Sequence, residues 1–330
     1  MRTTEARPAP LDRFRLFAST ELDEAREIVA RTFCDHRLRQ VRAGERLDAR
    51  HNHAPGQLFS LNYIRYGADV EIEPGELGSF YLIQIPISGT ATIRNGRTEV
   101  LAGPTRASIL NPDRHTAMRW HAGCEKILLQ VDREALGALV ESLSGHRLAG
   151  PVRFDPEIDL ERPEMAAWIR RVRALVAETD AGRLMPGTRD PFRQLLEEEL
   201  LGRFLALQPG NARHLVDGVR DRAQPGHVKR ALAYIRANLD GPVSLADLAA
   251  AAGVSGRTVQ LGFQASFGLS PLQVARSERL KQVHFALLSR NDDTPIAELA
   301  SAWGFSHMGR FSALYRQAFG CLPSETRALH

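Results

Sequence analysis

The most constraining feature of this 330-residue chain is a repeat in its last hundred residues. Two sets of positions recur at fixed spacings, and one extra residue separates the sets. At a spacing of 51, Leu245, Asp247, Leu248, Ala249, Gly253 and Ser255 recur as Ile296, Glu298, Leu299, Ala300, Gly304 and Ser306. At a spacing of 52, Val259, Phe263, Phe267, Gly268 and Pro271 recur as Phe311, Tyr315, Phe319, Gly320 and Pro323. A repeat this regular indicates one structural unit that the chain uses twice.

Each copy predicts a short helix, a tight turn and a second helix. Glycine accepts the positive φ that ends a helix, which assigns the turns to Gly253 and Gly304. A serine hydroxyl satisfies free N–H groups at the start of the next helix, a role that we assign to Ser255 and Ser306. This is the pattern of a helix-turn-helix motif, whose second helix enters the DNA major groove. One such turn is common in helical proteins that do not bind DNA, but two copies favour DNA binding.

The first helices are expected at 245–252 and 296–303, and a longer helix at 271–289 connects the copies. On this connecting helix, Arg276 and Lys281 occupy the polar side, where they can contact phosphates. If the helix holds the two units about 34 Å apart, one turn of DNA, both second helices reach successive grooves on one face of the duplex.

The excess positive charge lies in the same region. Residues 226–330 contain 11 Lys and Arg against 7 Asp and Glu, whereas the first 225 residues contain 32 of each. A basic domain fits a polyanionic partner, although a solvated surface explains four charges equally well.

The first part of the chain reads as a β-rich domain. Between residues 42 and 131, apolar and polar positions alternate in short runs separated by turn residues, with the hairpin signal Asn95-Gly96. Many short strands at this spacing predict a small barrel or sandwich. The expected strands are Phe59 to Tyr66, Val70 to Ile72, Phe80 to Ile87, Thr90 to Ile93 and Lys126 to Val131.

Two segments indicate boundaries between parts of the chain. Residues 208–226 contain a Pro-Gly pair near each end, Pro209-Gly210 and Pro225-Gly226. The segment has no sustained apolar period, which predicts a linker. A weaker break falls near Gly145 to Pro156. Between 162 and 207, apolar residues recur at helical spacing and predict two antiparallel helices, which either pack on the barrel or contribute to a dimer interface. The expected parts are 1–145 (barrel), 146–207 (helical extension), 208–226 (linker) and 227–330 (DNA-binding domain).

Composition and targeting signals indicate a cytoplasmic protein. Hydrophobic residues make up 43% and charged residues 25%, values typical of soluble globular domains. No run of 18 apolar residues occurs, and residues 1–10 carry charges and prolines where a secretion signal needs an apolar segment. We therefore expect no membrane partner. The three cysteines are far apart in the sequence, which argues against disulfides and against a Cys-rich zinc site.

Residues 226–330 resemble the DNA-binding domain of AraC/XylS-type transcription regulators. The resemblance rests on Leu245-Ala246-Asp247-Leu248-Ala249, Gly253-Val254-Ser255, Phe263 to Pro271 (FQASFGLSP), Arg279-Leu280, and Ile296 through Gly304-Phe305-Ser306 to Phe319-Gly320 and Pro323. Residues 58–145 resemble the cupin-like N-terminal domain of one subgroup, through LNYIRYGADVEI, IPISGTATI and a following helix from Arg133 to Leu143.

The resemblance implies an α+β multidomain fold, with a cupin-like β-barrel and flanking helices before an all-α domain that carries both helix-turn-helix motifs. It also implies an effector-responsive activator of transcription that reads two adjacent major-groove segments. The implied partners are double-stranded DNA, RNA polymerase, a small-molecule effector and a second copy of the chain. No cofactor is implied.

By resemblance, the base contacts fall on the second helix of each copy. They are Arg257, Thr258, Gln260 and Leu261 in the first copy, and Met308, Arg310, Ser312 and Ala313 in the second. Many family members carry arginine at the positions of Leu261 and Ala313, and neither residue can make the bidentate pair that arginine makes with guanine. We expect Leu261 to touch a thymine methyl group, while Arg257 and Gln260 supply polar contacts. Arg310 is the only long polar donor at the start of the second helix, so we expect that copy to act mainly through phosphates, with a solvated face as the alternative for either arginine.

A cupin-type, metal-dependent enzyme or sensor with a DNA-binding tail is the alternative function. His51-Asn52-His53 supplies two histidines at i and i+2, which face the same side of a strand. No carboxylate occurs between His53 and Asp69, so His115 or His121 would have to complete the three ligands that a catalytic metal needs. We therefore expect exposed loop histidines, no metal and no enzymatic activity.

A small closed barrel can also hold a ligand in its interior. Aromatic walls and an arginine would suit an organic or aromatic acid, and the resemblance implies effectors of this kind. Ordinary packing is the alternative for each residue. The candidate ligand-binding residues are Tyr63, Arg65, Tyr81, Arg106, Arg114 and Trp120.

Overall fold

The computed structural model describes residues 9–42, 44–184, 190–216, 225–288, 294–319 and 321–328. The chain forms two compact units. The first comprises Met1–Ala181 and Leu196–Ala223, and the second comprises Gly182–Leu195 and Gln224–His330.

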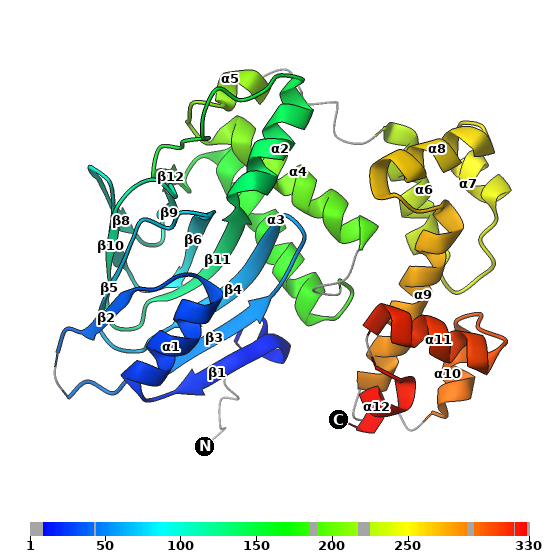
Figure 1. The fold of residues 1–330 in the computed structure, drawn as a ribbon, viewed down its shortest axis with the longest axis horizontal. Helices are drawn as coiled ribbons and strands as arrows, with labels where there is room; N and C mark the ends of the chain where they lie inside the picture. Colours follow the sequence, from blue (N-terminus) through cyan, green and yellow to red (C-terminus); the bar gives the residue numbers. More distant parts are fainter. Residues whose placement is uncertain are drawn as a thin grey trace. The chain divides into compact units, whose positions relative to one another are not determined.

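Two antiparallel sheets form the body of the first unit (Figure 1). The seven-stranded sheet has the order β1 (Arg15–Ser19), β3 (Ala49–Ala54), β4 (Phe59–Arg65), β11 (Glu125–Asp132), β6 (Phe80–Ser88), β9 (Arg106–Leu110), β12 (Glu157–Asp159). The five-stranded sheet has the order β2 (Arg37–Gln40), β5 (Val70–Gly75), β10 (Thr116–Trp120), β7 (Ala91–Asn95), β8 (Thr98–Ala102). The predicted strands are confirmed, and so is the hairpin, since Asn95 pairs with Thr98 and Gly96 has a φ of +64°.

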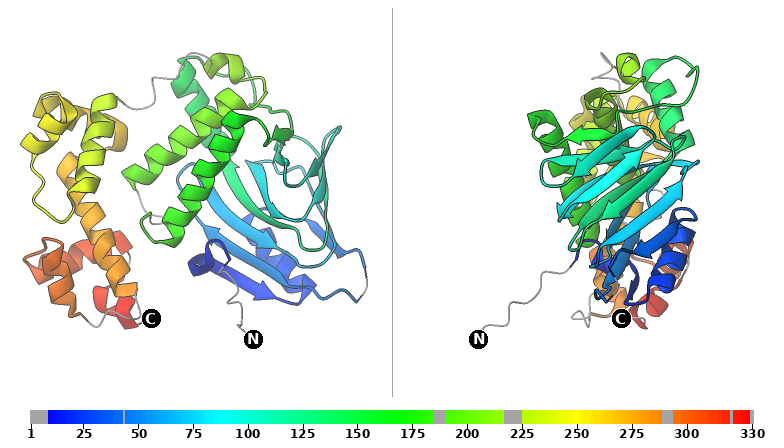
Figure 2. Two further views of the ribbon diagram at one scale, coloured as in Figure 1. Left: turned by 180° about the vertical axis from the view of Figure 1, so that it is seen from behind. Right: turned by 90° about the vertical axis from the view of Figure 1, so that its left-hand side faces the viewer.

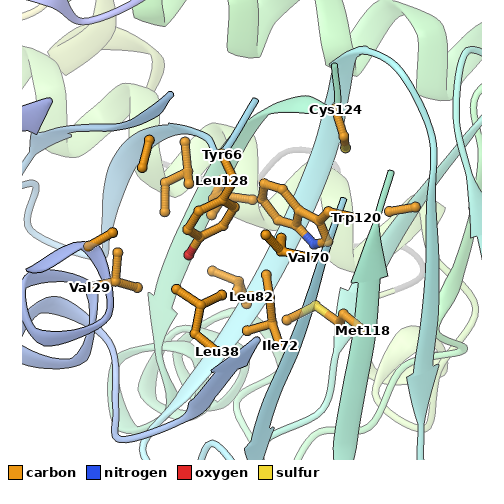
Figure 3. Close-up of a cluster of buried hydrophobic side chains, with 14 of the residues drawn as sticks. Val29, Leu38, Tyr66, Val70, Ile72, Leu82, Met118, Trp120, Cys124 and Leu128 are labelled. Carbon is orange, nitrogen blue, oxygen red and sulfur yellow. The ribbon is translucent and has the colours of Figure 1, made fainter. Parts of the chain in front are cut away.

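The core of the first unit lies between the two sheets. Ile64, Leu82 and Leu128 of the larger sheet belong to the same buried cluster as Ile72 and Met118 of the smaller sheet (Figure 3). Alternation along each strand places these residues on the inner face of each sheet. The strand pattern predicts a small barrel or sandwich of this kind, and the family resemblance implies that it is cupin-like.

Helices cover the barrel. Their bounds are α1 (Leu22–Thr32), α2 (Arg133–Ser144), α3 (Pro163–Asp180), α4 (Pro191–Leu207) and α5 (Arg213–Val216), with the short 3-10 helix η1 at Asp12–Phe14. Helix α3 lies along the outer face of the seven-stranded sheet (Figure 2), and Trp168 Nε1 donates to Leu200 O of α4 at 2.8 Å. Glu197 of α4 accepts the backbone N–H groups of Gln57 and Leu58 at 2.9 and 2.8 Å. The predicted helical extension therefore packs on the barrel of its own chain.

The start of the predicted linker at 208–226 is packed against the first unit. Gln208 Nε2 donates to the carbonyl oxygens of Asp155 and Glu157 at 2.7 and 2.8 Å, and Gly210 forms a β-bridge with Phe154. The Gln208 side chain thereby satisfies two backbone carbonyl groups of the first unit, and the β-bridge pairs the backbone of Gly210, where the Pro-Gly signal predicts irregular structure. Residues 217–224 lie outside the described residues.

The second unit is helical. Its helices are α6 (Gly226–Ala237), α7 (Leu245–Ala252), α8 (Gly256–Phe267), α9 (Pro271–Leu288), α10 (Ile296–Ala302), α11 (Met308–Phe319) and α12 (Pro323–Ala328). Helix α9 connects the group α6 to α8 with the group α10 to α12 (Figure 1). The predicted repeat is confirmed as two helix–turn–helix pairs, α7 with α8 and α10 with α11.

Candidate DNA-binding surface

Both turns depend on a glycine in the left-handed region. Gly253 has a φ of +66° and Gly304 a φ of +81°. A side chain at either position would be strained by about 1–2 kcal/mol, because Cβ would approach the following carbonyl oxygen. The glycines therefore fix the angle at which each second helix leaves its turn.

Arginines of α6 and α9 contact the segments around the first motif. Arg230 of α6 donates through Nε to Ala252 O at 3.0 Å, the last carbonyl of α7. Arg279 of α9 donates to Leu239 O at 3.0 Å and to Gly241 O, between α6 and α7, and a Cβ on Gly304 would lie 3.3 Å from its Nη1 atom. Arg230 thus fixes the end of α7, and Arg279 fixes the segment between α6 and α7.

Each second helix is anchored by two large side chains at equivalent positions of the repeat. Val259 and Phe263 are buried on α8, and Phe311 and Tyr315 are buried on α11. Because residues four apart lie on one face of a helix, these pairs fix which face is turned outward. In both second helices, the face opposite the buried pair is consequently turned to solvent.

The outward face of α8 contains all four predicted contact residues. Arg257, Thr258 and Gln260 are exposed, and Leu261 has 59% of its surface accessible. Ser255 is the N-cap, since its Oγ atom accepts from the backbone N–H of Thr258 at 3.2 Å. An exposed leucine beside two long polar donors is the arrangement expected for a surface that meets both polar and methyl groups of bases.

The outward face of α11 contains only part of the predicted set. Arg310 and Ala313 are exposed, whereas Ser312 is half-buried and Met308 packs against the core of its motif. Ser306 does not occupy the predicted cap position: α11 begins at Met308, so its N-cap position falls on His307. The physical reason is the extra residue of the second copy, which separates the serine from the helix start.

The two predicted phosphate contacts on α9 differ in their surroundings. Arg276 is exposed. The expectation that Lys281 faces solvent is wrong, because it is only 2% exposed and its Nζ atom lies 2.7 Å from Asp190 Oδ2, beside Glu278. Burial raises the pKa of Glu278 to about 7, and the neighbouring ammonium group of Lys281 opposes this rise. Lys281 is thus part of a buried charged cluster of the second unit.

Two exposed residues extend the outward faces and were missed from the sequence. Gln264 lies seven residues after Arg257 on α8, and Arg316, at the equivalent position of the repeat, lies three residues after Ala313 on α11. Continuing the helical period by one turn would have identified both.

Two domain families match the chain. The AraC-binding-like domain matches residues 25–206, and a helix-turn-helix domain family matches residues 248–329. The chain belongs to the AraC/XylS-type family of transcription regulators. It is therefore a DNA-binding transcription regulator, and its exposed α8 and α11 are the second helices of its two motifs.

Relatives of this AraC-type regulator match over nearly its whole length. A probable thc operon regulatory protein of Rhodococcus erythropolis is 29% identical, covering 94% of both chains. A XylDLEGF operon transcriptional activator of Pseudomonas putida is 24% identical, covering 96% of this chain and 95% of the relative. Among solved structures, a probable AraC family transcriptional regulator from Rhodopseudomonas palustris is 35% identical, covering 32% of this chain and 97% of that one with a TM-score of 0.31.

The histidines of the enzyme alternative do not gather in this AraC-type regulator. His51 Nε2 and His53 Nδ1 both contact Asn62 Oδ1, at 2.9 and 2.8 Å. His115 lies 3.5 Å from Glu73 and His121 lies 3.8 Å from Asp69. The expectation of exposed loop histidines is wrong for His51, which is fully buried on β3, and for His53, which is half-buried on the same strand. In the described part of the chain, no three His, Cys, Asp or Glu side chains are placed to bind a metal ion.

The structure does not bring the six predicted ligand-binding residues together. Tyr63 and Arg65 line a groove on the outer face of the larger sheet, whereas Trp120 points into the barrel. Tyr81 donates its hydroxyl to Val152 O at 2.6 Å, and Arg106 and Arg114 are exposed. The reason is strand alternation, which turns Tyr63 and its neighbour Ile64 to opposite sides of β4.

None of the helices within the described ranges has the length and apolar character of a membrane span.

Proposed function

We propose that this regulator binds a specific operator by placing α8 and α11 in two adjacent major-groove segments of one duplex. The observation that carries the proposal is the matched outward faces of the two helices, each held by a buried pair at repeat-equivalent positions. Helix α9 has 18 residues and is therefore about 27 Å long, comparable with the ~34 Å turn of DNA.

The two helices have different roles in this proposal. On α8, Arg257 and Gln260 donate to base edges and Leu261 contacts a thymine methyl group. On α11, Arg310 and Arg316 are the long donors, so that helix binds mainly phosphates and sets the register. The first copy therefore supplies most of the base discrimination.

The remaining partners belong to the same proposal. We infer a homodimer that acts in the cytoplasm, contacts RNA polymerase and responds to a small-molecule effector. Activation of transcription is supported by the Pseudomonas putida relative, which is a transcriptional activator. A cupin-type enzyme is not proposed, since the family consists of transcription regulators and His51 and His53 form no group of three metal-binding side chains with other described residues.

The proposal is tested by selecting bound fragments from sheared genomic DNA with the purified full chain and sequencing them. We expect a small set of fragments with a shared site, and binding to that site that weakens steeply as salt rises. Equal retention of all fragments, or retention that does not depend on salt, would contradict it.

A further inference from the structure

A lysine without a carboxylate partner lies inside the barrel. Lys126 of β11 is fully buried, and its Nζ atom donates to Gln84 Oε1 at 2.7 Å and lies 4.0 Å from the ring centroid of Trp120. Across the described residues, no ion pair joins it to Asp or Glu, and Cys124 is the only neighbour with a Coulombic effect on its pKa. A buried ammonium group without an anion is strongly unfavourable, so it calls for an explanation.

Two further donors beside this lysine have no protein partner in the described residues. Ser108 Oγ and Trp120 Nε1 are buried without a hydrogen bond. Ser108 pairs with Gln84 across β9 and β6, and residues directly opposite in neighbouring strands point to the same side of a sheet. Ser108, Gln84 and Lys126 thus lie on the inner face of the larger sheet, and Trp120 faces them from the smaller one.

A small apolar cavity adjoins this polar group. It has a volume of about 50 Å³, and its walls include Tyr66, Met118, Trp120 and Leu128, most of them aromatic or aliphatic (Figure 3). Two of these walls touch the polar group directly, because Trp120 lies against Lys126 and Met118 Sδ accepts from Gln84 Nε2 at 3.1 Å. The interior therefore combines one cation, free donors and an apolar space of a few heavy atoms.

We propose that the barrel interior binds a small carboxylate, whose charged group pairs with Lys126 and whose short apolar part occupies the adjoining cavity. Ser108 and Trp120 supply hydrogen bonds to the carboxylate oxygens, and Gln84 orients the ammonium group. Trp120 lines the cavity and also lies against Lys126, so a ligand that reaches both contacts its indole ring. This site names the effector class of the regulator and goes beyond its DNA binding.

The pairing makes binding depend on pH in a definite direction. Burial lowers the pKa of Lys126 to about 7 in the free protein. Among the other titratable groups near it, burial lowers the pKa of His51 to about 4, lowers that of His36 in the cavity wall, and raises the pKa values of Cys124 and Tyr66, so none of them gains a positive charge as the pH rises above 7. A bound anion favours the protonated lysine, so affinity falls about tenfold per pH unit above 7 and binding takes up a proton there.

The test uses the full chain and three probes of increasing size: acetate, propionate and isobutyrate. Thermal unfolding and titration calorimetry are measured at pH 6 and pH 8.5, with acetamide, propionamide and isobutyramide as neutral matches. We expect the carboxylates to raise the unfolding temperature with concentration and to bind at least tenfold more weakly at pH 8.5. The amides should have no such effect.

Matched variants assign the effect to the lysine. Lys126→Met keeps the side-chain length without the charge, and it should abolish carboxylate binding while leaving the protein at least as stable. Should this variant not fold, Ser108→Ala removes one donor and should weaken binding severalfold. Arg114→Ala, an exposed arginine of the same unit, should bind like the wild type.

Three results would overturn the proposal: no stabilisation of the wild type by any carboxylate, equal stabilisation of Lys126→Met, or equal stabilisation by sodium chloride. Binding of the same preparation to operator DNA is measured in parallel. Because the ligand assay reads the first unit and the DNA assay the second, failure of one is distinguishable from failure of the other.

Discussion

At the scale of single residues, we propose that sequence discrimination rests on Arg257, which is exposed in the first turn of α8. Replacing it with alanine should weaken binding to the selected operator by about 1–3 kcal/mol and relax the preference at one base pair. Competition binding against operator variants measures both effects. Equal losses on operator and random DNA would show that Arg257 contacts phosphate instead.

Arg276 and Lys281 lie five residues apart on α9 but should respond to substitution in different ways. Arg276→Ala should weaken binding to all DNA sequences alike and reduce the slope of log affinity against log salt by about 1. Lys281→Met should leave that slope unchanged and lower stability, because it leaves Asp190 and Glu278 buried without their cation. For both variants, salt titrations of DNA binding measure the slope, and urea denaturation measures the stability. A changed salt slope for Lys281→Met would mean that Lys281 leaves Asp190 and Glu278 and contacts a phosphate when the protein binds DNA.

Two buried lysines show why sequence analysis could not place every charged residue. The periodicity of a single segment says nothing about which distant residue will cover it. The carboxylate that buries Lys281 lies 91 positions earlier in the chain, and the side chains around Lys126 come from three separate strands. A buried charge of this kind becomes visible only when the tertiary structure brings its partners together.

At the scale of elements, the two copies differ in one capping interaction. Ser255 caps α8, whereas Ser306 lies two residues before α11. Ser255→Ala should therefore lower stability by about 1 kcal/mol, and the matched variant Ser306→Ala should stay within about 0.5 kcal/mol of the wild type. Urea denaturation followed by circular dichroism of the helices compares them. Equal losses in the two variants would mean that both serines act as caps.

Most elements were predictable from local chemistry. The glycine turns, the repeat and the helical spacing predicted α7, α9 and α10 to within one residue, and the Asn95-Gly96 signal predicted the hairpin of β7 and β8. Local patterns could not show that residues 208–216 pack on the first unit, because those contacts involve Asp155 and Glu157 more than fifty positions earlier. Nor could they show which barrel residues meet, since the order of strands in a sheet is a tertiary property.

At the scale of the whole molecule, an effector acts only if it binds two states of the regulator with different affinities. A carboxylate inside the first unit meets this condition when its affinity differs between the free regulator and the operator-bound regulator. The two proposals are then linked, because ligand and DNA must alter each other's affinity by the same factor.

The central claim, that α8 and α11 bind one duplex together, is tested most directly by changing the spacing within the selected operator. Footprinting should show two protected major-groove segments about 10 base pairs apart on one face of the DNA. Inserting five base pairs between them should turn the second segment to the opposite face and reduce affinity to that of random DNA. Unchanged affinity after the insertion, or a single protected segment, would contradict the claim.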